Sequence, residues 1–187
     1  MKLREDCFMS FKESTQNIVA VLDDLIYNYL EECEFSEFAN CENVFIIRSA
    51  NMVNFKKLVS DLQEANAQVF IYVLTHKINE QAVVEICGRN CEVVPFSGSS
   101  NYTIDFMSEQ IDYLKSKKID KFIAMLNNVS AIGLNIDEIM INISKENIYY
   151  YDIFQSLKRV KEPVLKYKSS VLYNSLCDWF WDYQEYI

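Results

Sequence analysis

The chain has 187 residues, half of them apolar and 14% aromatic, which suits one domain with a substantial buried core. Its formal net charge of −9 argues against nucleic acid as a partner, because neutralising phosphates requires clustered lysine and arginine. No apolar run approaches the roughly 20 residues that a membrane span needs. Acids stand at the N-terminus where a signal peptide would be apolar, so we expect a cytoplasmic protein.

The first predicted element is an amphipathic helix over residues 14–33. Apolar side chains recur there at helical spacing, and acids and amides occupy the opposite side. The surrounding segment, residues 1–42, holds ten acids against three bases. We predict it to be an N-terminal helical segment that flanks the main fold.

Residues 43–152 alternate short apolar runs with helical patterns. The runs are continuous rather than alternating, as expected for strands covered on both faces; the predicted strands are 43–47, 68–75, 91–96, 121–127 and 147–152. Strands separated by helices at this spacing predict a parallel sheet with right-handed crossovers. We therefore expect a Rossmann-like three-layer α/β fold with a parallel five-stranded sheet in the order 3-2-1-4-5.

The last segment, residues 153–187, is predicted to be helical, with Pro163 near a helix start. Its closing aromatic residues, among them Trp179 and Trp181, cannot all lie on one stripe. They predict either a core role or a contact with a second copy or another protein, for which Trp and Tyr are frequent anchors. The basic stretch 156–168 is expected to be a solvated linker face, or alternatively to dock against the acidic N-terminal segment.

Six cysteines occur, and none of them forms a C-x-x-C pair. Cys87 and Cys91 are close in sequence, but only His76 could join them as a nitrogen ligand to a metal. His76 is predicted at the carboxyl end of a strand and Cys87 at the far end of the next helix. We therefore expect free buried thiols in a reducing compartment, with no metal site and no cofactor.

A candidate ligand site lies where the first and fourth predicted strands end. In doubly wound sheets ligands bind beyond the carboxyl ends of the strands, at the point where the strand order reverses. A guanidinium and four amides would converge there, the first to hold an anion and the others to bind hydroxyls: Arg48, Asn51, Asn54, Asn127 and Asn128. A purely local role in turns and caps is the alternative for such residues. Neither the dinucleotide motif nor the P-loop pattern is present.

The stretch 43–62, followed by "AQVFIYVLT", "CEVVPF" and "KIDKFIAMLNNVSAIGLNIDEIMINISKENIYYYD", resembles the N-terminal half of heptosyltransferase-like glycosyltransferases. These are two-domain enzymes of the GT-B architecture, and the resemblance covers roughly residues 43–152. In that family the first strand ends in Arg and a Gly-Asp pair opens the following helix, the Asp acting as base on the acceptor hydroxyl. Arg48 matches this pattern, whereas Val53 and Asn54 stand at the Gly and Asp positions.

This departure bears on function, because an amide has no basic oxygen near neutral pH and valine narrows the approach of a substrate. The family also binds its sugar nucleotide mostly in a second domain, for which we expect no room after residue 152. We therefore predict a noncatalytic binding or assembly module without catalytic residues. The alternatives are an enzyme, or enzyme subunit, acting on a sugar or nucleotide-sugar ligand at the Arg48/Asn127 crevice, and a scaffold that dimerises through its terminal helices.

Overall fold

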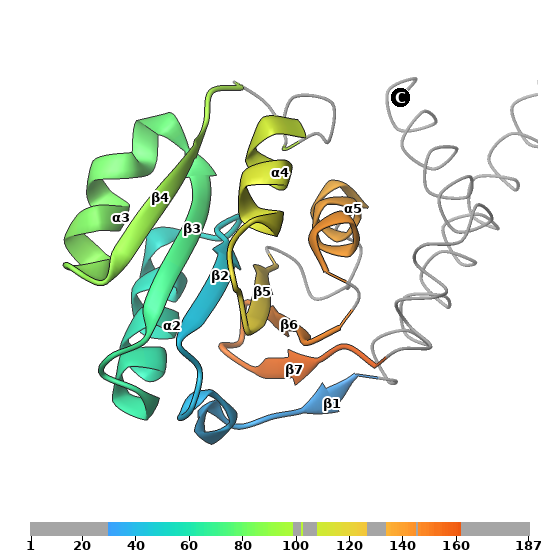
Figure 1. Cartoon of the computed structure of the whole chain (residues 1–187). Helices are drawn as coiled ribbons and strands as arrows, with labels where there is room; N and C mark the ends of the chain where they lie inside the picture. Colours follow the sequence, from blue (N-terminus) through green and yellow to red (C-terminus); the bar gives the residue numbers. More distant parts are fainter. Residues whose placement is uncertain (1–29, 99–101, 103–107, 127–133, 145, 162–187) are drawn as a thin grey trace, which may run out of the picture.

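Strands and helices alternate along the residues that the computed structural model describes, which are 30–98, 102, 108–126, 134–144 and 146–161 (Figure 1). In chain order the elements are β1 (Glu31–Glu32), the 3-10 turn η1 (Phe35–Phe38), β2 (Asn43–Ile47), α2 (Met52–Ala65), β3 (Phe70–His76), the 3-10 turn η2 (Lys77–Asn79), α3 (Glu80–Cys87), β4 (Cys91–Phe96), α4 (Ser108–Lys115), β5 (Lys121–Met125), α5 (Leu134–Ile143), β6 (Ile148–Tyr151) and β7 (Leu157–Arg159).

Seven strands of the described residues form one mostly parallel sheet, in the order β1-β7-β6-β5-β2-β3-β4. The strands from β4 through β3, β2 and β5 to β6 are parallel to their neighbours, whereas β7 and β1 pair antiparallel. The α/β class is confirmed, but the prediction of a wholly parallel five-stranded sheet is wrong. The two additional strands cover the edge of β6, where unpaired backbone groups would otherwise be open to pairing.

The continuous apolar run of β2 is divided between the two faces of the sheet. Val44 and Ile46 belong to the apolar cluster that includes α2 and α3 residues, whereas Phe45 and Ile47 belong to the cluster that includes α4 and α5 residues. Successive side chains of a strand point to opposite faces, so this run supplies both cores. Figure 1 shows α2 and α3 on one side of the sheet and α4 and α5 on the other. Each fully buried side chain of this size contributes about 1.5–3 kcal/mol.

The end of the predicted N-terminal helix is a strand instead. Residues 31 and 32 form β1, and the Cys33 N–H donates to the Leu157 carbonyl oxygen at 3.0 Å. Residues 14–29 of that predicted helix lie outside the described residues. Helical spacing in a sequence indicates only a periodic apolar face. At residues 31 and 32 the backbone forms its hydrogen bonds with β7 instead of within a helix.

The basic stretch is not a solvated linker over residues 157–160, because Leu157, Lys158 and Val160 are buried. Its alternative interpretation, docking against the acidic N-terminal segment, is confirmed for residues 158 and 159 by the pairing of β7 with β1, whereas residues 162–168 lie outside the described residues. Lys158 Nζ lies 3.9 Å from a Glu32 carboxylate oxygen, and Lys161 Nζ lies 3.8 Å from Glu31. The carboxylates of both pairs are more than half exposed, so each pair contributes little, and the backbone pairing and the buried Leu157 hold the two strands together.

A polar cluster fastens η1 to the amino ends of β5 and β6. The Tyr149 hydroxyl donates to a Glu37 carboxylate oxygen at 2.8 Å, and Lys121 Nζ donates to the Tyr149 hydroxyl at 2.8 Å. Lys121 Nζ also lies 3.3 Å from the same carboxylate and 4.6 Å from the centroid of the Phe38 ring. The cluster therefore ties the acidic N-terminal segment to strands that follow it by more than eighty residues in the chain.

The described part of the chain omits the residues just before α4. Ile111 and Leu114 are buried on α4, whereas residues 103–107 lie outside the described residues. The predicted C-terminal aromatic helix also lies outside them, and so does its proposed partner contact. No helix within the described ranges is long and apolar enough to cross a membrane.

Candidate functional site

The carboxyl ends of β2 and β5 lie side by side, because these two strands are adjacent and parallel. The Ser49 hydroxyl, just after β2, donates a hydrogen bond to the Met125 carbonyl at the end of β5. The turn 48–51 then leads into α2. Asn127 and Asn128, which follow β5, lie outside the described residues, so the structure describes only the β2 side of the predicted site.

Arg48 is directed into the fold and is only 8% exposed. Its Nε donates to Thr75 Oγ1 at 2.7 Å, and its Nη1 donates to the Ala50 carbonyl at 2.9 Å. Burial of the guanidinium lowers the pKa of Arg48 from its ordinary value. These contacts fasten the β2–α2 turn to β3. The Arg48 guanidinium, which was expected to hold an anion, donates two of its hydrogen bonds to the protein itself.

Tyr102 contacts the turn after β2 and was not predicted as part of the site. Its hydroxyl donates to the Arg48 carbonyl at 3.0 Å, and its ring centroid lies 4.6 Å from His76 and 5.2 Å from Phe96. Burial raises the pKa of the Tyr102 hydroxyl. The signal in the sequence is slight: Tyr102 is the aromatic residue in the otherwise polar stretch "SGSSNY".

His76 lies at the carboxyl end of β3, as predicted, and its ring packs edge-on against Phe96 with the centroids 5.3 Å apart. Cys91 pairs with Ile71 near the start of β3, at the opposite end of the sheet from His76. The two cysteines and the histidine are therefore separated by the length of a strand. Within the residues that the structure describes, no three His, Cys, Asp or Glu side chains group in a way that would hold a metal ion.

Asn51 is the N-cap of α2, and its Oδ1 accepts a hydrogen bond from the Asn54 backbone N–H at 2.9 Å. Asparagine is favoured at this position because its side chain satisfies one of the unpaired amides at the start of a helix. The local interpretation of Asn51 therefore agrees with the structure.

Asn54 stands at the position that the resemblance assigns to the catalytic Asp, and it is 6% exposed. Its Oδ1 accepts a hydrogen bond from Gln155 Nε2 at 3.4 Å. Gln155 belongs to the turn between β6 and β7, which the Asp152 carboxylate shapes by accepting from the Phe154 and Ser156 amides at 2.9 and 3.0 Å. This turn covers Asn54. The sequence pattern did not predict the contact, because Gln155 and Asn54 are 101 residues apart in the chain.

The large apolar side chains that remain exposed include three that follow the carboxyl ends of parallel strands. Val53 after β2 is 74% exposed, Ile78 after β3 is 91% exposed, and Phe154 after β6 is 68% exposed. Because β2, β3 and β6 run in the same direction, these three residues lie along one edge of the sheet. We call them the apolar edge.

No protein-family model matches the chain, and neither the curated proteins nor the solved structures include a significant match.

Proposed function

We propose that this chain is a noncatalytic binding or assembly module whose Rossmann-like core corresponds to half of a glycosyltransferase of the GT-B architecture. The observation that carries the proposal is the state of Asn54, which is an amide where the resemblance requires an acid and is buried under Gln155. A general base must reach the proton that it removes, and an amide oxygen does not accept one at neutral pH.

The remaining described side chains of the crevice support the same proposal. Arg48 donates to Thr75 and to a backbone carbonyl, and Asn51 caps α2, so both serve the fold itself. A sugar site needs polar groups that are presented to the ligand, since hydroxyls must exchange water for protein hydrogen bonds. The described residues of this region also expose three large apolar side chains, Val53, Ile78 and Phe154.

The apolar edge favours a protein over a sugar as the partner. Val53, Ile78 and Phe154 each leave most of their surface in water. Burying such side chains against another protein releases about 25 cal/mol for each Å² of apolar surface. A sugar offers little apolar surface in return.

An enzyme or enzyme subunit acting on a sugar or nucleotide-sugar ligand is the second candidate. It is favoured by the meeting of the β2 and β5 carboxyl ends, which is the place where doubly wound sheets bind ligands. In this case Arg48 and Asn127 would be the contact residues, with a second subunit supplying the base.

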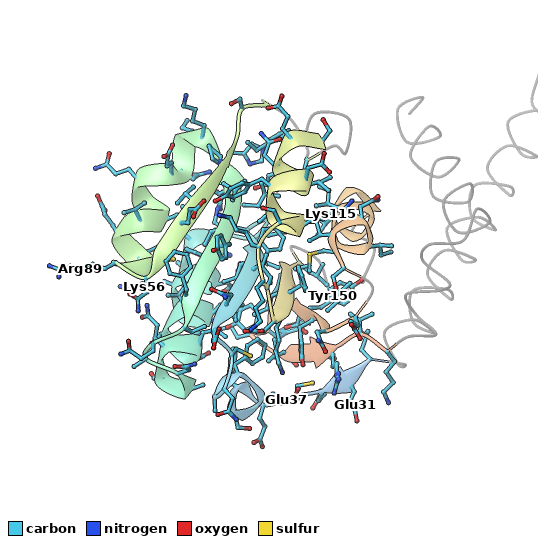
Figure 2. The ribbon with its side chains drawn as sticks, in the orientation of Figure 1. Glu31, Glu37, Lys56, Arg89, Lys115 and Tyr150 are labelled. Carbon is cyan, nitrogen blue, oxygen red and sulfur yellow. The ribbon has the colours of Figure 1, made fainter. Side chains whose placement is uncertain are left out.

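A thermal-shift screen with nucleotide sugars and free nucleotides separates the two candidates. A ligand at 100 times its dissociation constant stabilises a protein by about 2.7 kcal/mol, and the binding module is expected to show no such stabilisation. A dose-dependent shift that Arg48→Lys abolishes and Lys56→Gln leaves intact would overturn the proposal. Lys56 is a suitable control because it is an exposed cation on α2 (Figure 2).

Small-angle X-ray scattering over a concentration series determines whether a second copy is the partner. A compact monomer of this length has a radius of gyration of about 16 Å, and self-association raises that value. If copies associate through the apolar edge, the double variant Ile78→Ser, Phe154→Ser weakens the association. The matched control is Val84→Ser, since Val84 is 47% exposed on α3 and lies outside the edge.

A further inference from the structure

Cys87 and Cys91 meet where α3 ends and β4 begins. Cys87 is the last residue of α3 and is 2% exposed, and Cys91 is the first residue of β4 and is partly buried. Both side chains face the same apolar cluster, on the α2 and α3 side of the sheet. Their sulfur atoms are therefore on one side of the connecting turn.

The backbone on either side of this turn is held in place. Gly88 adopts φ +74°, a conformation that glycine tolerates best, and its N–H donates to the Val84 carbonyl at 2.9 Å. The Cys87 carbonyl accepts from Gln63 Nε2 at 3.0 Å, and the Asn90 carbonyl accepts from the Ile71 N–H at 3.0 Å. The turn that joins the two cysteines is therefore held by hydrogen bonds on both sides.

Each thiol affects the protonation of the other. The hydrogen bond between Cys87 and Cys91, together with burial, raises the pKa of Cys87, and the same hydrogen bond lowers the pKa of Cys91. Cys91 is therefore the thiol with the greater thiolate fraction and is also the more exposed of the two. An accessible thiolate next to a second thiol is the arrangement found in redox-sensing cysteines.

We propose that Cys87 and Cys91 are a redox-active pair that hydrogen peroxide converts to an intramolecular disulfide. This proposal does not depend on the proposed function. A disulfide has an S–S length of about 2.05 Å, so closure requires the two sulfurs to move into bonding distance. Rotation of the two side chains can supply that approach, because Cys91 is not fully enclosed.

The reaction balances with peroxide as the oxidant. The Cys91 thiolate attacks one peroxide oxygen, the O–O bond breaks, and the departing hydroxide takes up a proton to become water. The Cys87 sulfur then attacks the resulting Cys91 sulfenic acid, the S–O bond breaks, and the second hydroxide leaves as water with the Cys87 proton. Peroxide gains two electrons, and the two sulfurs together lose two. A dithiol reductant reverses the reaction by thiol–disulfide exchange.

Arg89 makes the test direct, because trypsin cleaves between the two cysteines. Figure 2 shows Arg89 pointing away from the fold. Tryptic digestion gives peptides 78–89 and 90–115, each with a single cysteine. After peroxide treatment of the native full-length chain and alkylation, we expect these two peptides as one linked species that dithiothreitol separates. The intact monomer should lose two hydrogen atoms in mass.

Two variants and one internal control complete the design. Cys91→Ser should abolish both the linked species and any sulfenic acid at this turn, whereas Cys87→Ala should leave a Cys91 sulfenic acid that dimedone traps. Cys33 is the internal control, because it is partly buried like Cys91, but burial and the nearby Glu37 raise its pKa to about 11. Unlinked peptides with Cys91 oxidised beyond the sulfenic acid, or faster oxidation of Cys33 than of Cys91, would overturn the proposal. Linkage of either cysteine to a different one would also overturn it.

Discussion

Replacing Arg48 by methionine tests whether its guanidinium belongs to the fold or to an open ligand site. The substitution removes the donors to Thr75 Oγ1 at 2.7 Å and to the Ala50 carbonyl at 2.9 Å. Hydrogen bonds from a charged group contribute about 1.5–3 kcal/mol each. Relief of the buried charge offsets part of this loss. We therefore expect the free energy of unfolding to fall by about 2–4 kcal/mol, or roughly 4–16 °C in Tm.

A double-mutant cycle with Thr75→Val makes the expectation specific. Thr75 is fully buried, so Arg48→Met leaves its hydroxyl without the guanidinium donor. Replacing both partners by apolar groups of similar shape is less costly than the sum of the two single changes. We expect a coupling free energy of about 1–3 kcal/mol.

Urea unfolding followed by far-ultraviolet circular dichroism measures all four members of the cycle. An exposed ligand-binding arginine would behave differently, since surface substitutions usually change stability by less than about 0.5 kcal/mol. A near-neutral Arg48→Met, or additive single changes, would show that the guanidinium is not engaged as described. The crevice would then be available to a ligand.

Three further predictions concern the capping, the polar cluster and the α3–β4 turn. Asn51→Ala should lower the free energy of unfolding by about 0.5–2 kcal/mol, and Asn51→Asp should preserve it because aspartate also caps a helix. Burial raises the pKa of Glu37, but hydrogen bonds from Tyr149 and Lys121 outweigh it, so the pKa lies below its ordinary value of 4.5. The Glu37 carboxylate therefore stabilises the fold at pH values above 4.5. In urea unfolding at a series of pH values, the destabilisation caused by Glu37→Gln should shrink as the pH falls below 4.5. Gly88→Ala should cost about 1–3 kcal/mol in urea unfolding through backbone strain alone, because a Cβ there meets nothing within 4 Å; an unchanged midpoint would contradict the positive φ.

Local pattern was sufficient to predict most elements of the described core. The continuous apolar residues of β2 and β3 and the helical spacing of α2 each report burial within a few residues of the chain. The same local information indicated Asn51 as a turn or cap residue, since a cap bonds to a backbone amide three residues away. Local pattern did not predict β1 and β7, whose pairing brings together residues 31–32 and 158–159.

The candidate site could be placed from the sequence but not interpreted from it. Parallel strands put Arg48 at the carboxyl edge, and the pattern could not tell whether the guanidinium would face a ligand or the fold. Its partner Thr75 is 27 residues away, and the partner of Asn54, Gln155, is 101 residues away. No periodicity connects residues at such separations.

The sequence by itself determined the α/β class and the amide at residue 54, because residue identity and short-range periodicity are properties of the linear chain. Only the tertiary structure decided that Arg48 is bonded inside the fold, that Gln155 covers Asn54, and that two added strands close the β6 edge. The physical reason is that a buried polar group must find a hydrogen-bond partner, and the partner within reach is set by packing rather than by distance along the sequence.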